Sequence, residues 1–518
     1  MRNCCCRYLV NRLSRSGSCA VLLLLLSWVV PAGAALNYTT NDGTITITGC
    51  TSTGQVDIPG LINGLPVSCI GASAFSGLAG VTGVSIPAGV TSIEDRAFFN
   101  CSGLVSVALP NSITNMGEAA FSGCTSLGAV TIPTGVGELR NDVFSNCRSL
   151  AAVTIPSSVT KIGDGAFYSC MSLASITLPP TLTRLGNYAF AQAFTLSRIG
   201  IPGGVTRIES YAFYGCGGLS AVTITNGVAA IDSYAFYGCS SLGSIGIPPS
   251  VTEIGDHVFH DCPGLAAFVV DPLNTVFSSR DGVLFDKAQA RLIQYPWAKF
   301  GGYTVPAGVQ VIGHSAFTGC NGLTSILMGI GVAAIESYAF SGCNLLESVS
   351  LDASLTTISE GVFSGCASLS RITIPASVGS IGDWAFSFCR SLGEVACLGS
   401  APAVGEYAFE GADNVVIYRP AGSTGWGATL AGRPVLTRGV LTVATVAGAA
   451  FSGVPARFGF TINGTSNLVV VVEASTDLGA AVWVPVSTNT IGTATAVFSD
   501  PDSGSGQRRF YRLRRIQP

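Results

Sequence analysis

The sequence predicts a solenoid of 23-residue coils followed by a small all-β sandwich domain. Phenylalanine recurs every 23 residues through most of the chain, and the residues around it repeat with it. A fixed period of this kind indicates a repeat array, in which each unit packs only on its neighbours. The period ends before residue 438, where short runs of alternating apolar residues begin. Fourteen phenylalanines mark the coils: Phe75, Phe98, Phe121, Phe144, Phe167, Phe190, Phe213, Phe236, Phe259 and, after a gap of 58 residues, Phe317, Phe340, Phe363, Phe386 and Phe409.

Composition limits the class of protein. The chain of 518 residues is too long for one ordinary core, and with 48% apolar and 11% charged residues it is not a disordered chain. Its mean hydropathy of +0.51 is high. The only long apolar stretch is Ala20 to Val30, however, and these eleven residues fall short of the ~20 that span a bilayer. A polytopic membrane protein is therefore excluded.

Residues 1–34 are predicted to be a signal peptide. Four arginines precede the apolar stretch, and residues 32–34 read AGA, a small-residue cleavage site. We expect cleavage near Ala34, a secreted or cell-surface location, and no transmembrane span in the mature chain. Removing these four arginines from the 26 basic residues leaves 22 against 29 acidic ones, a net charge of −7. This charge argues against a nucleic-acid partner.

One coil shows how the repeat is built. Around Phe98, apolar residues recur at Val90, Ile93, Leu104 and Val107. The alternating stretch after Leu104 predicts a short strand, and the Asp, Glu, Asn or Ser three residues before most of the phenylalanines predicts the N-cap of a short helical turn. About seven buried apolar side chains at ~2 kcal/mol each cannot offset an ordering cost of ~1.5 kcal/mol per residue. No coil can fold alone, so the coils must stack.

The unit is similar to a known family. Residues 150–170 read LAAVTIPSSVTKIGDGAFYSC. They resemble the repeat of the BspA-like leucine-rich repeats, L-x-x-I-x-I-P-x-x-V-x-x-I-G-x-x-A-F-x-x-C. The resemblance covers roughly residues 40–435 and implies a leucine-rich-repeat solenoid with a short strand and a short helical turn in each coil. Because BspA-like proteins are implicated in adhesion to host or matrix proteins and to other cells, it also implies an adhesin-like role.

The resemblance and the period together predict the domain boundaries. Residues 35–72 look like the N-terminal cap of the family, and residues 73–400 are the solenoid, with a hairpin-like insert at about 263–304. Residues 401–437 resemble the closing segment of such arrays. Residues 438–518 hold short β-branched runs separated by turn sequences such as DPDSG, which predicts a β-sandwich module like those found on secreted bacterial proteins.

The cysteines predict a thiol ladder and one disulfide. Fourteen cysteines follow the signal peptide, an even count that invites disulfides in an exported protein. Eleven of them stand three residues after a column phenylalanine. Stacked coils would hold their Cβ atoms ~4.8 Å apart, which is above the disulfide range, so we expect buried free thiols there. Cys50 and Cys69 lie in the N-terminal cap, off this ladder, and are predicted to pair.

Aromatic residues flank the phenylalanine column on five successive coils. They stand two residues before the phenylalanine or one residue after it. Because they neighbour an inward-facing column, we expect them to face outward as a strip of rings about 5 Å apart, a pattern typical of recognition surfaces. Alternatively, the rings only shield the turns. The predicted binding residues are Tyr168, Tyr188, Tyr211, Tyr214, Tyr234, Tyr237, His257 and His260. A rival surface is the strand face, where small neutral residues such as Thr177, Gly200 and Thr223 could accept a flat partner.

The sequence holds no recognisable catalytic motif. It lacks H-E-x-x-H, a P-loop and G-x-S-x-G, so we expect no enzyme activity and no cofactor. His257 and His260 offer only two imidazoles, so no metal is expected and a metal-dependent hydrolase is a remote alternative. We therefore expect an exported or cell-surface repeat protein that mediates adhesion, or binds an extracellular protein or glycan, through its extended surface. The alternative is a structural spacer or envelope component without a specific ligand.

Overall fold

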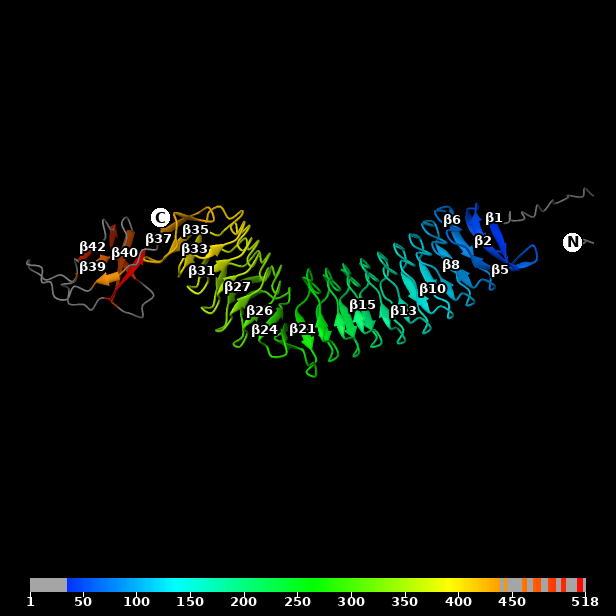
Figure 1. The fold of residues 1–518 in the computed structure, drawn as a ribbon, viewed down its shortest axis with the longest axis horizontal. Coiled ribbons are helices and arrows are strands. Elements are labelled where there is room, and N and C mark those ends of the chain that lie inside the picture. Colours follow the sequence, from blue (N-terminus) through cyan, green and yellow to red (C-terminus); the bar gives the residue numbers. More distant parts are fainter. Residues whose placement is uncertain are drawn as a thin grey trace, which may run out of the picture.

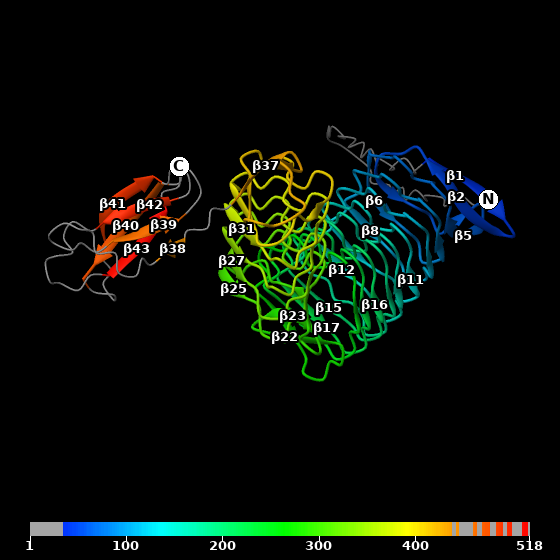
Figure 2. The same cartoon turned by 60° about the vertical axis from the view of Figure 1, so that its left-hand side comes forward.

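The coils stack into one curved array, which Figure 1 shows as an arc that begins at β1 and β2 and ends at β35 and β37. The computed structural model describes residues 35–437, 442–444, 459–463, 469–476, 483–490, 495–499 and 510–515. The predicted signal peptide lies outside these residues. In the view turned by 60°, the N-terminal cap strands and β37 again lie at opposite ends of the array (Figure 2).

One face of the array is built from the longer strand of each coil. These strands pair in parallel with the equivalent strand of a neighbouring coil, as Arg198 pairs with Ala221. Alternate side chains point inward, so Ile199 and Ile201 are buried while Arg198 and Gly200 are exposed. The strands of this face are β3 (Gly54–Asp57), β6 (Val81–Ser85), β8 (Ser106–Ala108), β10 (Ala129–Thr131), β12 (Ala152–Thr154), β15 (Arg198–Ile201), β17 (Ala221–Ile224), β19 (Ser244–Ile247), β21 (Ala267–Val270), β25 (Gly301–Thr304), β27 (Leu323–Leu327), β29 (Ser348–Ser350), β31 (Arg371–Ile374), β33 (Glu394–Cys397), β35 (Val416–Arg419) and β37 (Arg433–Thr437).

A second, lateral ladder consists of two-residue strands. Most of them carry one buried apolar residue of the repeat, such as Ile162 in β13, next to a more exposed residue, such as Lys161. Its strands are β7 (Ser92–Ile93), β9 (Asn115–Met116), β11 (Glu138–Leu139), β13 (Lys161–Ile162), β14 (Arg184–Leu185), β16 (Arg207–Ile208), β18 (Ala230–Ile231), β20 (Glu253–Ile254), β26 (Val311–Ile312), β28 (Ala334–Ile335), β30 (Thr357–Ile358), β32 (Ser380–Ile381) and β34 (Ala403–Val404).

The third side of each coil is a run of turns, and the prediction of a short helical turn is wrong. Within the part of the chain that the structure describes, no helix is found. The amides of Arg96, Phe98 and Asn100 donate to carbonyl oxygens of the next coil at 2.7–2.8 Å. Arg96 and Asn100 also have positive φ angles of 57° and 56°. A helix needs successive amides to bond within its own segment, and here alternate amides bond to the neighbouring coil instead.

The residues that the sequence predicts to be helix N-caps accept hydrogen bonds from backbone amides of the next coil instead. Asp95 Oδ1 accepts a hydrogen bond from the Glu118 amide at 2.8 Å, one coil away. Asn141 Oδ1 accepts from the Asp164 amide in the same way, at 2.9 Å. The side-chain chemistry is that of a cap, but the capped amide belongs to the neighbouring coil.

The phenylalanine column is the centre of the core. All fourteen rings are at most 2% exposed. Rings on consecutive coils stack with centroids 4.7–5.8 Å apart, close to the strand spacing. The column therefore holds the coils in register from within.

The predicted thiol ladder is present. All fourteen cysteines in the described part of the chain are free. In ten of the eleven ladder positions, Sγ lies 2.9–3.4 Å from the carbonyl oxygen of the phenylalanine one coil earlier. Burial raises the pKa of these thiols, to about 12 for Cys216. The slot thus selects a small residue that also donates a weak hydrogen bond to an inner carbonyl.

The predicted Cys50–Cys69 disulfide is not formed in the structure, where both residues are free thiols. Parallel pairing of β2 (Thr44–Cys50) with β5 (Leu65–Ile70) places Cys69 opposite Thr46, four residues along β2 from Cys50. Four residues of strand span ~13 Å, whereas bridged Cα atoms lie within ~7 Å. The pairing stays a prediction that this register does not favour.

An antiparallel insert interrupts the repeat. Its strands β22 (Phe277–Arg280), β23 (Val283–Asp286) and β24 (Arg291–Gln294) pair in order, and β24 then pairs in parallel with β26. Tyr295 takes the place of a column phenylalanine, because its ring stacks on Phe317 at 4.8 Å and its amide donates to the Ala316 carbonyl. The boundaries at 263 and 304 stay predictions.

Short antiparallel strands lie at both ends of the described array. At the N-terminal end, β1 (Leu36–Asn41) pairs with β2, and β4 (Leu61–Ile62) with β5. At the other end, β36 (Thr429–Leu430) pairs with β37.

The C-terminal part is rich in strands. It holds two three-stranded antiparallel sheets, β38-β39-β42 and β41-β40-β43. Ile462 and Phe498 of the first sheet share an apolar cluster with Val470 and Val472 of the second. That the two sheets form one sandwich stays a prediction. The strands are β38 (Thr442–Ala444), β39 (Gly459–Asn463), β40 (Val469–Ser475), β41 (Val484–Thr490), β42 (Thr495–Ser499) and β43 (Phe510–Arg515).

Candidate binding surface

The turns place the predicted tyrosines beside the phenylalanine column. In each turn the residue two before the phenylalanine has a positive φ, such as 60° at Tyr211 and 61° at Tyr234. This conformation turns the side chain away from the core, while Phe213 and Phe236 point inward and are fully buried. Because the amides of each turn donate hydrogen bonds to carbonyl oxygens of the next turn, equivalent side chains of successive turns lie in a row.

The rings form two stacked files on neighbouring coils. In the first file Tyr188, Tyr211, Tyr234 and His257 stack at centroid distances of 4.6, 4.9 and 5.2 Å. In the second file Tyr214 stacks on Tyr237 at 5.3 Å. Tilted contacts of 5.7 and 5.8 Å join the files on two coils. We call these six residues the aromatic strip. Tyr168 lies on an earlier coil and is separated from the second file by Ala191.

Stacking decides which part of each ring is available. Tyr211 and Tyr234 have neighbours on both faces, so they present mainly ring edges and hydroxyl groups, and both are only partly exposed. Tyr188 is 42% exposed, because Gly165 occupies its slot in the preceding coil and leaves one ring face uncovered. Burial, and then the neighbouring Tyr211, raises the pKa of Tyr188, so its hydroxyl is protonated and can donate a hydrogen bond.

One predicted binding residue does not face outward. His260 is 5% exposed, and its Nδ1 lies 2.7 Å from Nδ1 of His257. Burial lowers the pKa of both imidazoles, that of His260 to about 3. His260 differs from Tyr237 in the same slot because the insert follows its coil, and the Gln294 side chain and the Ser315 backbone lie against its ring.

Sequence reasoning missed His314, which lies with His257 and His260 around one pocket of about 240 Å³. The available signal was that the chain has only three histidines, all near the insert. Among the described residues, no group of three or more His, Cys, Asp or Glu side chains is arranged to hold a metal ion.

The rival strand face has a shallow groove. It is about 600 Å³ in volume, and its floor is formed by Thr177, Gly200 and Thr223 with Arg198 beside them. No atom outside the adjacent residues lies within 4 Å of a Cβ built on Gly200, so the groove is open there. It presents small side chains and one cation, and no group positioned for chemistry.

Comparison with known proteins identifies the family. The family model described as "BspA type Leucine rich repeat region (6 copies)" matches residues 49–173, 160–280 and 295–416. The chain therefore belongs to the BspA-type leucine-rich repeat family. Among curated proteins, none matches this sequence.

Solved structures of bacterial leucine-rich repeat proteins are similar to this chain. A leucine-rich cell surface protein of Faecalibacterium prausnitzii is 30% identical, with a TM-score of 0.52, over 75% of this chain and 93% of its own. A leucine-rich repeat protein of Bacteroides ovatus is 23% identical, with a TM-score of 0.45, over 75% and 94%. The pneumococcal vaccine antigen PcpA is 18% identical, with a TM-score of 0.37, over 75% and 86%.

A search of the described residues for a membrane-spanning helix, one both long and apolar enough to cross a bilayer, finds none.

Proposed function

We propose that this protein is an exported or cell-surface binding protein, without enzyme activity, that mediates adhesion by holding an extracellular protein or glycan along its repeat surface. The observation that carries the proposal is the aromatic strip, in which six rings on four consecutive coils are partly exposed in one patch. Rigid aromatic side chains that present an apolar body and a hydroxyl are enriched at protein interfaces. The family supports the proposal, because its 30% identical relative is titled a cell surface protein.

The stacking favours a protein partner over a glycan along most of the strip. A sugar ring needs a free aromatic face, and Tyr211 and Tyr234 have both faces covered. Ring edges and hydroxyl groups suit the carbonyl groups and apolar side chains of a protein surface. A glycan has one candidate position, the uncovered face of Tyr188.

A screen with the full chain tests this function. Immobilised collagen, fibronectin, mucin and a glycan array are the probes. The triple variant Tyr188→Ser/Tyr211→Ser/Tyr234→Ser is expected to lose at least tenfold in affinity for the probe that binds the wild type. Tyr338→Ser is the matched control, since Tyr338 occupies the same slot outside the aromatic strip.

The alternative is a structural spacer or envelope component. The tyrosines then only cover the turns, and the triple variant binds cells and matrix proteins as well as the wild type does. That result, with the variant folded by circular dichroism, would reject the proposed binding surface.

A further inference from the structure

The inter-coil ladder of the turns breaks at one level. Every turn from Ser73 to Gly238 donates three amide hydrogen bonds to the next coil, and the turns from Ser315 to Phe388 do the same. In the described structure, the equivalent amides of His257, Phe259 and Asp261 have no backbone acceptor. The lateral ladder is also unpaired at this level, between β20 and β24, as it is between β9 and β11 and between β28 and β30. The turns before this level and the turns after it therefore form two separate hydrogen-bonded blocks. We call the level at which the two blocks meet, through side chains, the joint.

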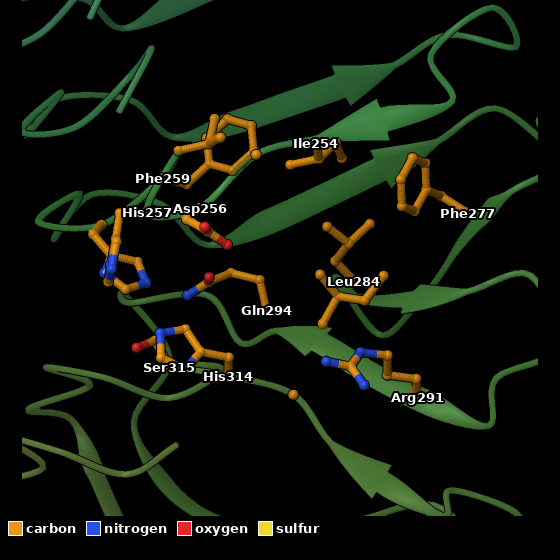
Figure 3. Close-up of a pocket in the computed structure, with 15 residues that line it drawn as sticks. Ile254, Asp256, His257, Phe259, Phe277, Leu284, Arg291, Gln294, His314 and Ser315 are labelled. Carbon is orange, nitrogen blue, oxygen red and sulfur yellow. The ribbon is translucent and has the colours of Figure 1, made fainter. Parts of the chain in front are cut away.

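The insert is the cause of the break. Leu292 pairs with Ile312 and Tyr295 stacks on Phe317, so the insert supplies one coil between the blocks. Two residues separate Leu292 from Tyr295, whereas four separate Ile312 from Phe317. This coil thus lacks two residues of the turn. The pocket of about 240 Å³ lies where the missing turn would be, between the turns of Phe259 and Phe317 (Figure 3).

The three histidines occupy the joint from both sides. His257 and His260 lie in the turn before the gap, and His314 lies in the turn after it. The ring centroids of His257 and His314 are 5.9 Å apart, and the two rings meet edge to face. Figure 3 shows His257 and His314 on one side of the pocket with Gln294 between the two turns. His260 also contacts the Gln294 side chain and the Ser315 backbone. Imidazole rings thus replace the missing backbone contacts.

The strand side of the joint stays bonded. The Ala298 amide donates to the Leu265 carbonyl and the Phe268 amide to the Gly282 carbonyl, both at 2.8 Å. A joint that is bonded on one side and filled by side chains on the other can open as a hinge.

The surroundings favour uncharged imidazoles. Burial lowers the pKa of His257 and His260, and each is lowered further by the nearby His314. Arg291, which lines the pocket, is ion-paired with Glu336, whose carboxylate also accepts from the His314 amide. The other titratable or charged groups that face the cluster are Asp256 and Asp261 on the same turn, Tyr234 and Tyr237 on the coil before, and Tyr338 on a coil after. The 2.7 Å contact between Nδ1 of His257 and Nδ1 of His260 needs one of the two nitrogens to accept a hydrogen bond, so the closed joint cannot hold both rings as imidazolium.

We propose that this joint is a pH-sensitive hinge, which is closed at neutral pH and opens on its turn side when His257 and His260 are protonated. The inference is independent of what the aromatic strip binds. Opening leaves the strip itself intact, because the turn of His257 stays bonded to the turn of Tyr234, whose amide donates to the Asp256 carbonyl.

The direction of the pH effect follows from linkage. In the closed state the pKa of His260 is about 3, whereas an imidazole exposed by opening has a pKa of about 6.5. The open state therefore binds more protons below pH 6.5, and the population of the closed state decreases as the pH falls. From pH 7.5 to 5.0, His260 alone shifts the closed-to-open ratio by about 30-fold, and carboxylates stay ionised in this window.

Hydrogen exchange of the full chain tests the hinge. Exchange rates, corrected for the intrinsic effect of pH, are measured at pH 7.5 and 5.0 for residues 254–262 and 291–297, which flank the joint. Residues 231–239, one coil earlier, are the internal control. We expect protection of the two joint segments to fall at least tenfold at pH 5.0, while the control segment is unchanged.

Two variants distinguish opening of the hinge from a loss of protection along the whole array at low pH. His260→Gln keeps a hydrogen-bonding side chain but cannot titrate, so its joint segments should keep the same protection at both pH values. Phe99→Gln removes a ring from the same slot in the unbroken ladder, far from the joint, and should keep the wild-type pH response. A flat wild-type profile, an unchanged response in His260→Gln, or a stoichiometric metal found by elemental analysis would overturn the proposal.

Discussion

The two hydrogen-bonded blocks of turns share the same core but differ on their surface. Both carry an unbroken phenylalanine column and a cysteine in nearly every coil. The outer slot two residues before the phenylalanine is different. In the first block the last four coils fill it with Tyr188, Tyr211, Tyr234 and His257 in succession. The earlier coils of that block hold Ser73, Arg96, Ala119, Asp142 and Gly165, and the second block holds Ser315, Tyr338, Gly361, Trp384 and Tyr407.

The second block shows that the fold does not need a ring in this slot. Gly361 and Ser315 occupy it with positive φ angles of 59° and 54°, and their turns keep all three inter-coil bonds. Trp384 and Tyr407 stack at 6.1 Å, without a longer file. The continuous file of the first block is thus an addition to what the coil requires. This argues for a role in binding and against simple shielding of the turns.

The largest effect is expected in the shared core. Phe213→Ala in the first block and Phe363→Ala in the second each remove a fully buried ring that is stacked on both sides. Each should lower the free energy of unfolding by about 3–5 kcal/mol, because the stacked coils cannot collapse into the cavity. Urea unfolding measures the loss. A cost below about 1 kcal/mol in either block would contradict an equivalent core.

A smaller effect is expected in the cysteine column. Cys239→Ala and Cys366→Ala each remove a thiol that donates to a phenylalanine carbonyl at 3.2–3.4 Å, and should cost about 1 kcal/mol. The chain offers its own control at Ala193, a ladder position inside the first block that lacks a thiol. Ala193→Cys should stabilise the array by a similar or smaller amount in the same urea titration. A destabilised Ala193→Cys variant would show that the thiol itself contributes nothing.

The smallest effect is expected where the first block lacks a ring. Gly165→Tyr extends the file beyond Tyr188, in a slot that accepts tyrosine at positive φ elsewhere, and its Cβ comes closer than 3 Å only to the movable end of the Asp142 side chain. A left-handed non-glycine residue costs about 1–2 kcal/mol and a stacked ring pair returns about 0.5–1.5 kcal/mol, so stability should change by less than about 1 kcal/mol. Thermal unfolding measures this. A loss above about 3 kcal/mol would mean that the outer slot is constrained by the fold after all.

Much of the fold could be predicted because the repeat is exact. The spacing of Phe98, Phe121 and Phe144 reveals the coil length, and the alternation after Leu104 reveals the strand. The prediction of a helical turn was wrong, although Asp95 is a residue type that caps helices. Its carboxylate does accept a hydrogen bond from a backbone amide, but this amide, that of Glu118, belongs to the next coil. Local propensity cannot tell a bond within a segment from a bond to the next coil.

The candidate surface was predictable only in part. Tyr211 and Tyr234 could be placed by spacing, since identical coils put identical slots in file. The burial of His260 and its meeting with His314 could not be predicted. They depend on a coil within the insert that is two residues short, and the insert has no period from which to count.

A hydrogen-exchange footprint of the full chain, with the matrix protein or glycan that binds it, shows directly whether the aromatic strip is the binding surface. We expect slower exchange in the turns around Tyr188, Tyr211 and Tyr234, with the strand face at 198–201 and 221–224 unchanged. Protection confined to those strands, or to the C-terminal strand at 510–515, would contradict this expectation.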